Sequence, residues 1–448
     1  MMDHRVFFIS LGCDKNLTDS EVMIGDLSAA GYLFTDDITE ADAIVVNTCC
    51  FIGDAKEESI NTILDAARYK TDGDARCLIV TGCLAERYRD EVIAEIPEVD
   101  AVLGTASVSE ITACMDSVFE GHPENFFLPT DTPPYTSGFR RNTSGLHYGY
   151  LKIAEGCDKR CTYCIIPNLR GPYRSVPMEK LIDEARRLAC DGVSELILVA
   201  QETTLYGVDL YGRKSLPELL RRLSDIEELH WIRILYCYPE EIDDELIDTI
   251  AELPKVCHYL DVPIQHASDR ILSRMGRRTT QEELATIIRH LRDKIPDIAV
   301  RTTLISGFPG ETGEDFEETY RFVNEMEFDR LGVFTYSREE DTPAADFPDQ
   351  IDEETAKARR DELMELQQAV VADMSEQLPG TVMEAVIEGS IPEEDVYVAR
   401  TYRDAPDVDG YVFIPIDRER MSGDYVKVRI TGVRDYDLTG EITDESAE

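Results

Sequence analysis

Residues 155–167 read EGCDKRCTYCIIP and contain three cysteines, Cys157, Cys161 and Cys164, in the spacing C-x3-C-x2-C. A cubane iron–sulfur cluster usually has four thiolate ligands. Three thiols from one short loop leave one iron without a protein ligand, and an open iron can bind and reduce a cofactor. The spacing therefore predicts a reactive cluster site instead of a structural one.

Two other interpretations of this loop stay open. A C-x2-C pair is common in zinc sites, but a zinc ribbon needs a second such pair, and the sequence has none. A thioredoxin-like pair would leave the third cysteine unexplained. The loop also has basic neighbours, which favour an anionic cluster and a ligand with a carboxylate, although a solvated loop would look the same. These neighbours are Lys152, Lys159, Arg160, Arg170 and Arg174.

Around this loop, strand-like runs alternate with helical patterns. Strands are predicted at 148–154, 195–200, 231–236, 258–262, 298–305 and 330–336, and helices at 179–191, 216–224, 243–252, 281–294 and 315–326. Six such units are fewer than the eight of a closed barrel, so we expect an open partial (β/α)6 barrel within residues 143–378. The run SGFPGETGED follows the fifth strand, and it predicts backbone contact between Gly307, Gly310 and a cofactor. A plain turn into a helix is the alternative.

A second group of cysteines precedes the barrel. Strands predicted at 5–9, 43–47, 76–80 and 101–103 alternate with helices at 19–30, 54–69, 86–96 and 107–119. This alternation predicts a doubly wound parallel sheet within residues 1–120. Cys13, Cys49 and Cys83 each follow one of the first three strands, so they are expected to meet at one edge of the sheet. They could instead be buried small hydrophobes, and spacing alone does not choose between Cys49 and Cys50.

Residues 121–142 are rich in Pro, Thr, Ser and Gly and are predicted to be a linker. A charged helix is expected at 352–378. The C-terminal part, residues 379–448, has short alternating runs separated by Gly and Asp turns, which predict a small all-β barrel. The predicted strands are 382–388, 396–400, 411–415 and 425–430.

The composition narrows the possible functions. The 448 residues suggest two or three domains. No signal peptide or membrane span is apparent, so we expect a cytoplasmic protein without a membrane partner. Its 12 cysteines are then reduced and suited to metal binding. The net charge of −45 disfavours strong binding to nucleic acid and favours a basic partner, unless it reflects an acidic cytosol or salt adaptation.

The motifs together resemble the methylthiotransferase family of radical S-adenosylmethionine enzymes. The resemblance covers nearly the whole chain, including LGCDKNLTDSE, NTCCFIGDAKEES, TGCLAERY and the triplet loop, and the C-terminal part resembles the TRAM domain. It implies two [4Fe–4S] clusters and S-adenosylmethionine as cofactors. The implied ligands are Cys157, Cys161 and Cys164 for the cluster that binds S-adenosylmethionine, and Cys13, Cys49 and Cys83 for an auxiliary cluster. Cys50 is then an addition to the family pattern.

Within that family, LVAQETTLYG, LDVPIQHASDRILSRMGRR and FDRLGVFTYSREEDTPA resemble the branch that modifies an aspartate of the twelfth small-subunit ribosomal protein. The resemblance implies that a radical removes hydrogen from the aspartate β-carbon and that the auxiliary cluster supplies sulfur. An electron donor protein and a sulfur source are implied partners. The alternatives are a transfer-RNA methylthiotransferase and a non-catalytic iron–sulfur protein that docks on ribosomes.

Charge favours the ribosomal-protein substrate independently. Residues 380–448 contain 17 acidic and 7 basic residues, a balance of −10. A module that binds RNA would neutralise phosphates with Lys and Arg, whereas this one would repel them. A basic ribosomal protein fits such a surface better. The alternative is that this module only shares the acidity of the whole chain.

Overall fold

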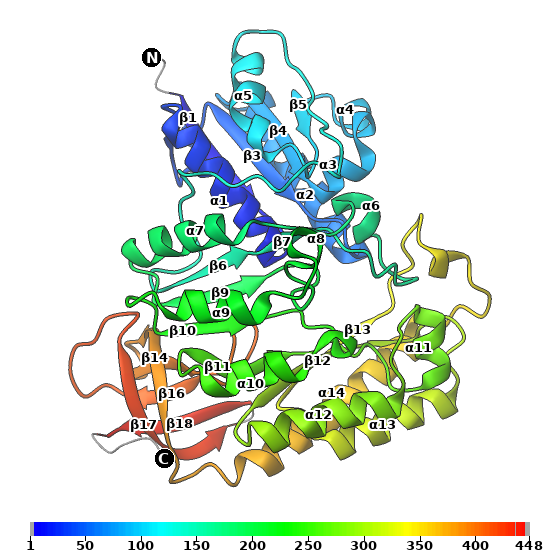
Figure 1. The fold of residues 1–448 in the computed structure, drawn as a ribbon. Coiled ribbons are helices and arrows are strands. Elements are labelled where there is room, and N and C mark those ends of the chain that lie inside the picture. The colour runs from blue at the N-terminus through cyan, green and yellow to red at the C-terminus, as the bar shows by residue number, and fades with distance from the viewer. Residues whose placement is uncertain (1–3, 435, 444–448) are drawn as a thin grey trace.

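The computed structural model describes residues 4–434 and 436–443, and the chain forms three parts (Figure 1). A five-stranded parallel sheet lies at one end, a six-stranded parallel sheet lies in the middle, and a closed five-stranded barrel follows. The helices α11 to α14 extend from the middle part on the side away from the closed barrel. The predicted fold class is confirmed in all three parts.

The N-terminal sheet has the strand order β2-β1-β3-β4-β5 with every pair parallel. Its central strands are buried along their whole length, as their continuous apolar sequences require. Helices cover both faces, with α2 on one side and α1 and α5 on the other. The elements are β1 (Arg5–Ser10), α1 (Asp14–Ala29), β2 (Leu33–Phe34), β3 (Ala43–Thr48), α2 (Gly53–Thr71), β4 (Cys77–Gly82), α3 (Cys83–Tyr88), α4 (Asp90–Glu95), β5 (Ala101–Leu103) and α5 (Ile111–Phe119).

Two predicted helices of this part were wrong in their limits. The first begins at Asp14, five residues before the predicted start, because its first turn is buried by contacts with the barrel that local periodicity does not reveal. The helix predicted at 86–96 is two helices, α3 and α4, separated by Arg89, which has a positive φ of 44° and ψ of −118°. The edge strand β2 was not predicted.

The middle sheet has the order β13-β12-β11-β10-β9-β6, and in the described residues it is an open sheet of parallel strands. Its six strands begin and end close to the predicted limits, and its helices pack around one large apolar core. The short helices α6, α8 and α11 were missed, because each occupies a loop. The elements are β6 (Tyr148–Lys152), β7 (Ala154–Glu155), α6 (Ile166–Arg170), β8 (Arg174–Ser175), α7 (Met178–Cys190), β9 (Glu195–Val199), α8 (Val208–Tyr211), α9 (Leu216–Ser224), β10 (Trp231–Ile234), α10 (Asp244–Glu252), β11 (Val256–Asp261), α11 (Asp269–Met275), α12 (Gln281–Lys294), β12 (Ala299–Ser306), α13 (Gly313–Met326), β13 (Arg330–Thr335) and α14 (Glu353–Ser375).

The C-terminal barrel contains a fifth strand that the sequence did not predict. β18 closes the barrel by pairing antiparallel with β17 and parallel with β16. Its sequence, DLTGEI, alternates too weakly to stand out. The strands are β14 (Val382–Ile391), β15 (Val396–Thr401), β16 (Val412–Pro415), β17 (Tyr425–Arg434) and β18 (Asp437–Ile442).

A buried ionic group attaches this barrel to the middle sheet. Glu195 of β9 accepts hydrogen bonds from Arg233 of β10 at 2.7 Å and from Arg400 of β15 at 2.5 Å. None of the three side chains is exposed. Nearby, Tyr148 donates to Asp407 and Tyr259 donates to Asp409, both at 2.8 Å. The loop after β15 is therefore hydrogen-bonded to side chains of β6 and β11 in the middle sheet.

Candidate metal centres

The three cysteines of the N-terminal part lie at one edge of its sheet. Cys13 immediately precedes α1, Cys49 follows β3, and Cys83 begins α3. The strands before them, β1, β3 and β4, are neighbours in the sheet, so their carboxyl ends lie side by side. The fold thus brings together cysteines that are distant in the sequence.

These thiols influence one another electrostatically. Burial raises the pKa of Cys83 to about 12, against the opposing effect of Arg170, and the thiols of Cys49, Cys50 and Cys13 add to the rise. Burial also raises the pKa of Cys49. A thiol has to lose its proton to bind a metal ion, so metal binding at these cysteines would release protons.

Cys49 and Cys50 have different surroundings. Gly12, with φ of +88°, passes closely over Cys49, and a Cβ there would lie 2.7 Å from the Cβ and 3.0 Å from the Sγ of Cys49. Cys50 has no exposed surface and lies in the apolar core with Ile63 and Leu84. This difference favours Cys49 as the ligand, and the assignment stays a prediction.

The other trio lies in the loop between β7 and α6. Backbone hydrogen bonds shape this loop: the Cys157 amide donates to the Gly171 carbonyl and the Cys164 amide to the Cys161 carbonyl, each at 3.1 Å. Burial raises the pKa of Cys157 to about 11, and it raises that of Cys164 as well. Cys161 contributes to both shifts.

Helix α11, which the sequence did not reveal, supports this loop through two hydrogen bonds. Thr162 donates from its amide to the Met275 carbonyl at 2.9 Å and from its hydroxyl to the Arg274 carbonyl at 2.8 Å. Both carbonyls belong to the last turn of α11. The position of the cysteine loop therefore depends on a segment more than a hundred residues away in the chain.

The donor atoms suit clusters better than single ions. In residues 4–434 and 436–443, no group of three His, Cys, Asp or Glu side chains is placed to hold one metal ion. Each cysteine of a cubane cluster binds a different iron, so the sulfur atoms are farther apart than around a single ion. Cys49, Cys83, Cys157 and Cys161 are buried, Cys164 is partly buried and Cys13 is exposed. Three thiols at each place fit a [4Fe–4S] cluster with one open iron.

Three further residues beside the loop were not predicted. The Tyr238 hydroxyl lies 3.7 Å from the Cys161 Sγ, and the Arg277 guanidinium lies over the Tyr238 ring, 4.2 Å from its centroid. Arg277 Nε and Nη1 and Glu202 Oε2 are buried and have no hydrogen-bond partner among the described residues. Burial raises the pKa of Glu202 to about 7. The only sequence signal was the position of Glu202, just after a predicted strand.

The two predicted glycine contacts have structural explanations of their own. Gly307 has φ of +72°, and a Cβ there would lie 2.4 Å from the Cβ of Ala356. Its amide donates to Glu311 at 2.8 Å. Gly310 has φ of +83° and lies against the guanidinium of Arg274. Contact of these glycines with a cofactor stays a prediction.

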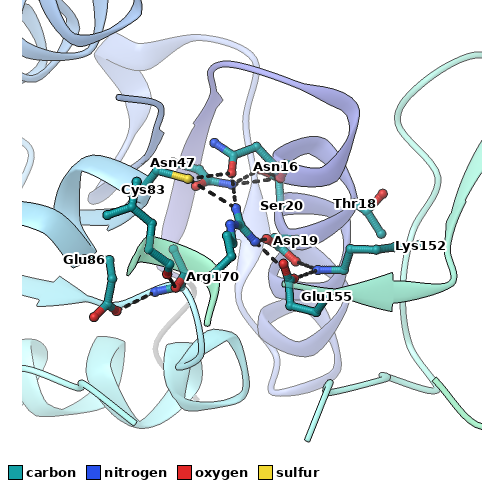
Figure 2. A network of polar contacts seen from close by, with 12 residues as sticks. Asn16, Thr18, Asp19, Ser20, Asn47, Cys83, Glu86, Lys152, Glu155 and Arg170 are labelled. Carbon is teal, nitrogen blue, oxygen red and sulfur yellow. Dashed lines mark hydrogen bonds and ion pairs between the residues drawn. The ribbon is translucent and has the colours of Figure 1, made fainter. Parts of the chain in front are cut away.

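The basic residues around the triplet do not form the positive island that the sequence suggested. Figure 2 shows Lys152 and Arg170 next to Asp19 and Glu155. Arg170 lies 2.6 Å from Asp19, and Lys152 lies 2.8 Å from Glu155. Lys159 is paired with Glu241 at 2.5 Å. Acidic residues from elsewhere therefore neutralise most of this charge.

Comparisons with known proteins agree with this arrangement. Residues 151–323 match the radical SAM superfamily, residues 5–104 match the uncharacterized protein family UPF0004, and residues 380–443 match the TRAM domain. The ribosomal protein uS12 methylthiotransferase RimO of Lachnoclostridium phytofermentans is 59% identical over 97% of this chain and 99% of its own length. The RimO protein of Acetivibrio thermocellus is 50% identical over the full length of both chains.

The chain belongs to the RimO family.

Solved structures show the same fold as this RimO family member at much lower sequence identity. The radical S-adenosylmethionine methyltransferase TsrM from Kitasatospora setae aligns with a TM-score of 0.56 at 15% identity, covering 86% of this chain and 81% of TsrM. The cobalamin-dependent radical enzyme OxsB aligns with a TM-score of 0.51 at 11% identity, covering 82% of this chain and 56% of OxsB. Among the described helices, none combines the length and apolar character that crossing a membrane requires.

Proposed function

We propose that this chain is a radical S-adenosylmethionine enzyme that methylthiolates the β-carbon of an aspartate in ribosomal protein uS12. The observation that carries the proposal is the pair of cysteine trios, one at the edge of the N-terminal sheet and one in the barrel loop. Arg170, at the end of the helix that follows the barrel loop, contacts Cys83 of the other trio. The near full-length similarity to proteins named uS12 methylthiotransferase supports the substrate.

Each trio has a role in this proposal. Cys157, Cys161 and Cys164 would hold the cluster that binds S-adenosylmethionine, and Cys13, Cys49 and Cys83 would hold the auxiliary cluster. When bound, these groups and S-adenosylmethionine supply the hydrogen abstraction, the sulfur and the methyl group. An aspartate β C–H bond is not acidic, so side-chain acid–base chemistry would not break it. The protein's own contribution is to position the groups and exclude water.

The residues beside the barrel loop would bind the amino-acid part of S-adenosylmethionine. Arg277 has two buried N–H groups without a partner among the described residues, which suits a carboxylate. Glu202 Oε2 is buried, lies 3.9 Å from the Nζ of Lys159 and has no hydrogen-bond partner among the described residues, so it can accept a hydrogen bond from an ammonium group. Tyr238 lies between Arg277 and Cys161 and closes this side of the site.

The remaining partners follow from charge and chemistry. The C-terminal barrel, with its balance of −10, would attract a basic ribosomal protein and would bind nucleic acid weakly. The reaction needs an electron donor protein and a source that restores the sulfur. Since the substrate is a ribosomal protein, we place the enzyme in the cytoplasm. We also propose domain limits at 1–120, 143–378 and 379–448, with a linker at 121–142.

The substrate is tested by incubating reconstituted enzyme, reductant and S-adenosylmethionine with either uS12 or transfer RNA, followed by mass spectrometry. A methylthio adduct on the uS12 aspartate is expected. An adduct on transfer RNA with unmodified uS12 would overturn the substrate and favour a transfer-RNA enzyme. Failure to form 5′-deoxyadenosine with either substrate would favour the non-catalytic protein that docks on ribosomes.

A further inference from the structure

Arg170 ends the short helix α6, which follows the triplet loop directly, and yet its side chain points into the N-terminal part (Figure 2). It is only 3% exposed. Its Nη2 lies 3.6 Å from the Sγ of Cys83 and also donates to the Oδ1 of Asn16. A residue of the barrel loop thus contacts a predicted ligand of the other trio.

Through Asn16, Arg170 is connected to the other two cysteine segments as well. The side-chain Nδ2 of Asn16 donates to the carbonyl of Leu11 at 3.0 Å and to the carbonyl of Thr48 at 2.8 Å. Leu11 lies two residues before Cys13, and Thr48 is next to Cys49. The Arg170 guanidinium therefore contacts Cys83 directly. It also contacts Asn16, whose side chain binds the backbone next to Cys13 and Cys49.

The helix that carries Arg170 is itself part of the N-terminal core. Ile165 and Leu169 are buried in the apolar cluster formed by α2, α3 and the sheet. The hydroxyl of Thr105 donates to the Leu169 carbonyl at 2.6 Å. The packing of Ile165 and Leu169 and the hydrogen bond from Thr105 therefore fix the position of the helix that carries Arg170.

The charges around Arg170 are balanced. Its Nη1 lies 2.6 Å from Asp19 and 3.2 Å from Glu155, and Lys152 pairs with the same two carboxylates. Two cations thus face two anions in a buried place. A buried charge without its partner is strongly destabilising, so a sensible variant must preserve this balance.

We propose that Arg170 is a positioning residue that aligns the auxiliary trio through Cys83 and Asn16 and sets the reduction potential of the auxiliary cluster. The inference rests on the proposed function, since it requires a cluster at Cys13, Cys49 and Cys83. Hydrogen bonds and positive charge near cluster sulfur stabilise the reduced form, which carries one more negative charge. Arg170 therefore raises the potential of this cluster, and from its place on the barrel loop it links the geometry of the two sites.

The test isolates the auxiliary cluster in a parent protein in which Cys157, Cys161 and Cys164 are replaced by Ala. In this background we compare Arg170→Lys, which keeps the charge but not the fork of N–H groups, with the double variant Arg170→Gln/Asp19→Asn, which removes one cation and one anion together. Arg68→Gln is the matched control, because Arg68 lies in α2 of the same part of the chain and pairs with Asp65 on the exposed surface. Iron content, unfolding midpoint and the potential from an anaerobic redox titration followed by electron paramagnetic resonance are measured.

The expected result is a more negative potential in both Arg170 variants and an unchanged potential in Arg68→Gln. A folded Arg170→Lys protein that no longer retains iron would equally support alignment of the trio by Arg170. Full iron content with the parent potential in both variants would overturn the inference and leave the proposed function standing. A parent protein that binds no iron would overturn the auxiliary cluster and, with it, the proposed function.

Discussion

At the scale of single residues, the auxiliary site leaves little free space. Gly12 has φ of +88° and lies within van der Waals distance of Cys49, so a hydrogen atom is the only side chain that fits. Gly31, at the other end of α1, has φ of +99° and open space around it. The two glycines therefore both have a positive φ, and they differ in what a side chain would meet.

Gly12→Ala should both destabilise the protein and disturb the auxiliary trio. Strain at positive φ costs about 1 kcal/mol or more, and here the new Cβ also pushes against Cys49. Chemical denaturation and iron content measure the two effects. Gly31→Ala should show the strain alone, with iron content unchanged. Equal iron content in both variants would contradict the role given to Gly12.

Substitutions can test the prediction that Cys49, and not its neighbour Cys50, binds the auxiliary cluster. Cys49→Ala should remove one cluster, lowering iron from about eight to about four atoms per chain, and should stop methylthiolation while 5′-deoxyadenosine still forms. Cys161→Ala should abolish cleavage of S-adenosylmethionine. Cys50→Ala is the matched control and should keep full iron and activity. Normal product from Cys49→Ala with loss of iron in Cys50→Ala would reverse the assignment.

At the scale of elements, β9, β10 and β15 are joined by the ionic group of Glu195, Arg233 and Arg400. Burial opposes ionisation of Glu195, but Arg400 and Arg233 hold its pKa at about 2. In the unfolded chain the pKa returns to 4.5. The carboxylate therefore stabilises the folded protein above about pH 4.5, and this contribution is lost as the pH falls towards 2.

This linkage predicts how Glu195→Gln behaves. At pH 7 the variant should lose about 3 kcal/mol or more of unfolding free energy, because two buried arginines lose their anion. The difference from the natural protein should shrink as the pH falls from 4.5 towards 2, where Glu195 itself becomes neutral. Urea unfolding at several pH values measures it. Glu228→Gln, on an exposed turn, should change stability by about 0.5 kcal/mol or less at every pH. A pH-independent difference for Glu195→Gln would contradict the pairing.

At the scale of the whole molecule, the net charge of −45 dominates the long-range field. A basic substrate is drawn towards such a surface, and salt screens the attraction beyond about 8 Å at physiological ionic strength. The C-terminal barrel shares this charge and is fixed to the catalytic part by buried ion pairs. The negative field of the C-terminal barrel therefore acts on a substrate that approaches the middle, catalytic part.

The rate of association with uS12 should consequently fall with salt. Between about 50 and 300 mM NaCl we expect at least a tenfold decrease, measured by stopped-flow fluorescence of labelled uS12. The unfolding midpoint over the same range serves as the control for protein integrity. An association rate independent of salt would show that the acidic surface plays no part in substrate recognition.

Much of the fold could be predicted from the sequence, because buried strands have continuous apolar runs and amphipathic helices have a regular period. The six strands of the middle sheet and the four of the N-terminal sheet that have such runs were found in this way. The strand β18 and the helices α6 and α11 were missed, since DLTGEI and the two short helices acquire their structure from contacts with distant segments. The first turn of α1 was missed for the same reason.

The sequence by itself determined the number and spacing of the cysteines, the order of strands and helices, and the acidic character of the chain. Only the tertiary structure decided that Arg170 would lie beside Cys83 and that Glu195 would hold the C-terminal barrel. It also decided that Arg277 Nε and Nη1 and Glu202 Oε2 would be buried without a hydrogen-bond partner among the described residues. The physical reason is that periodicity and spacing report on neighbours along the chain. Contacts between side chains that are a hundred residues apart depend on how whole elements pack against one another.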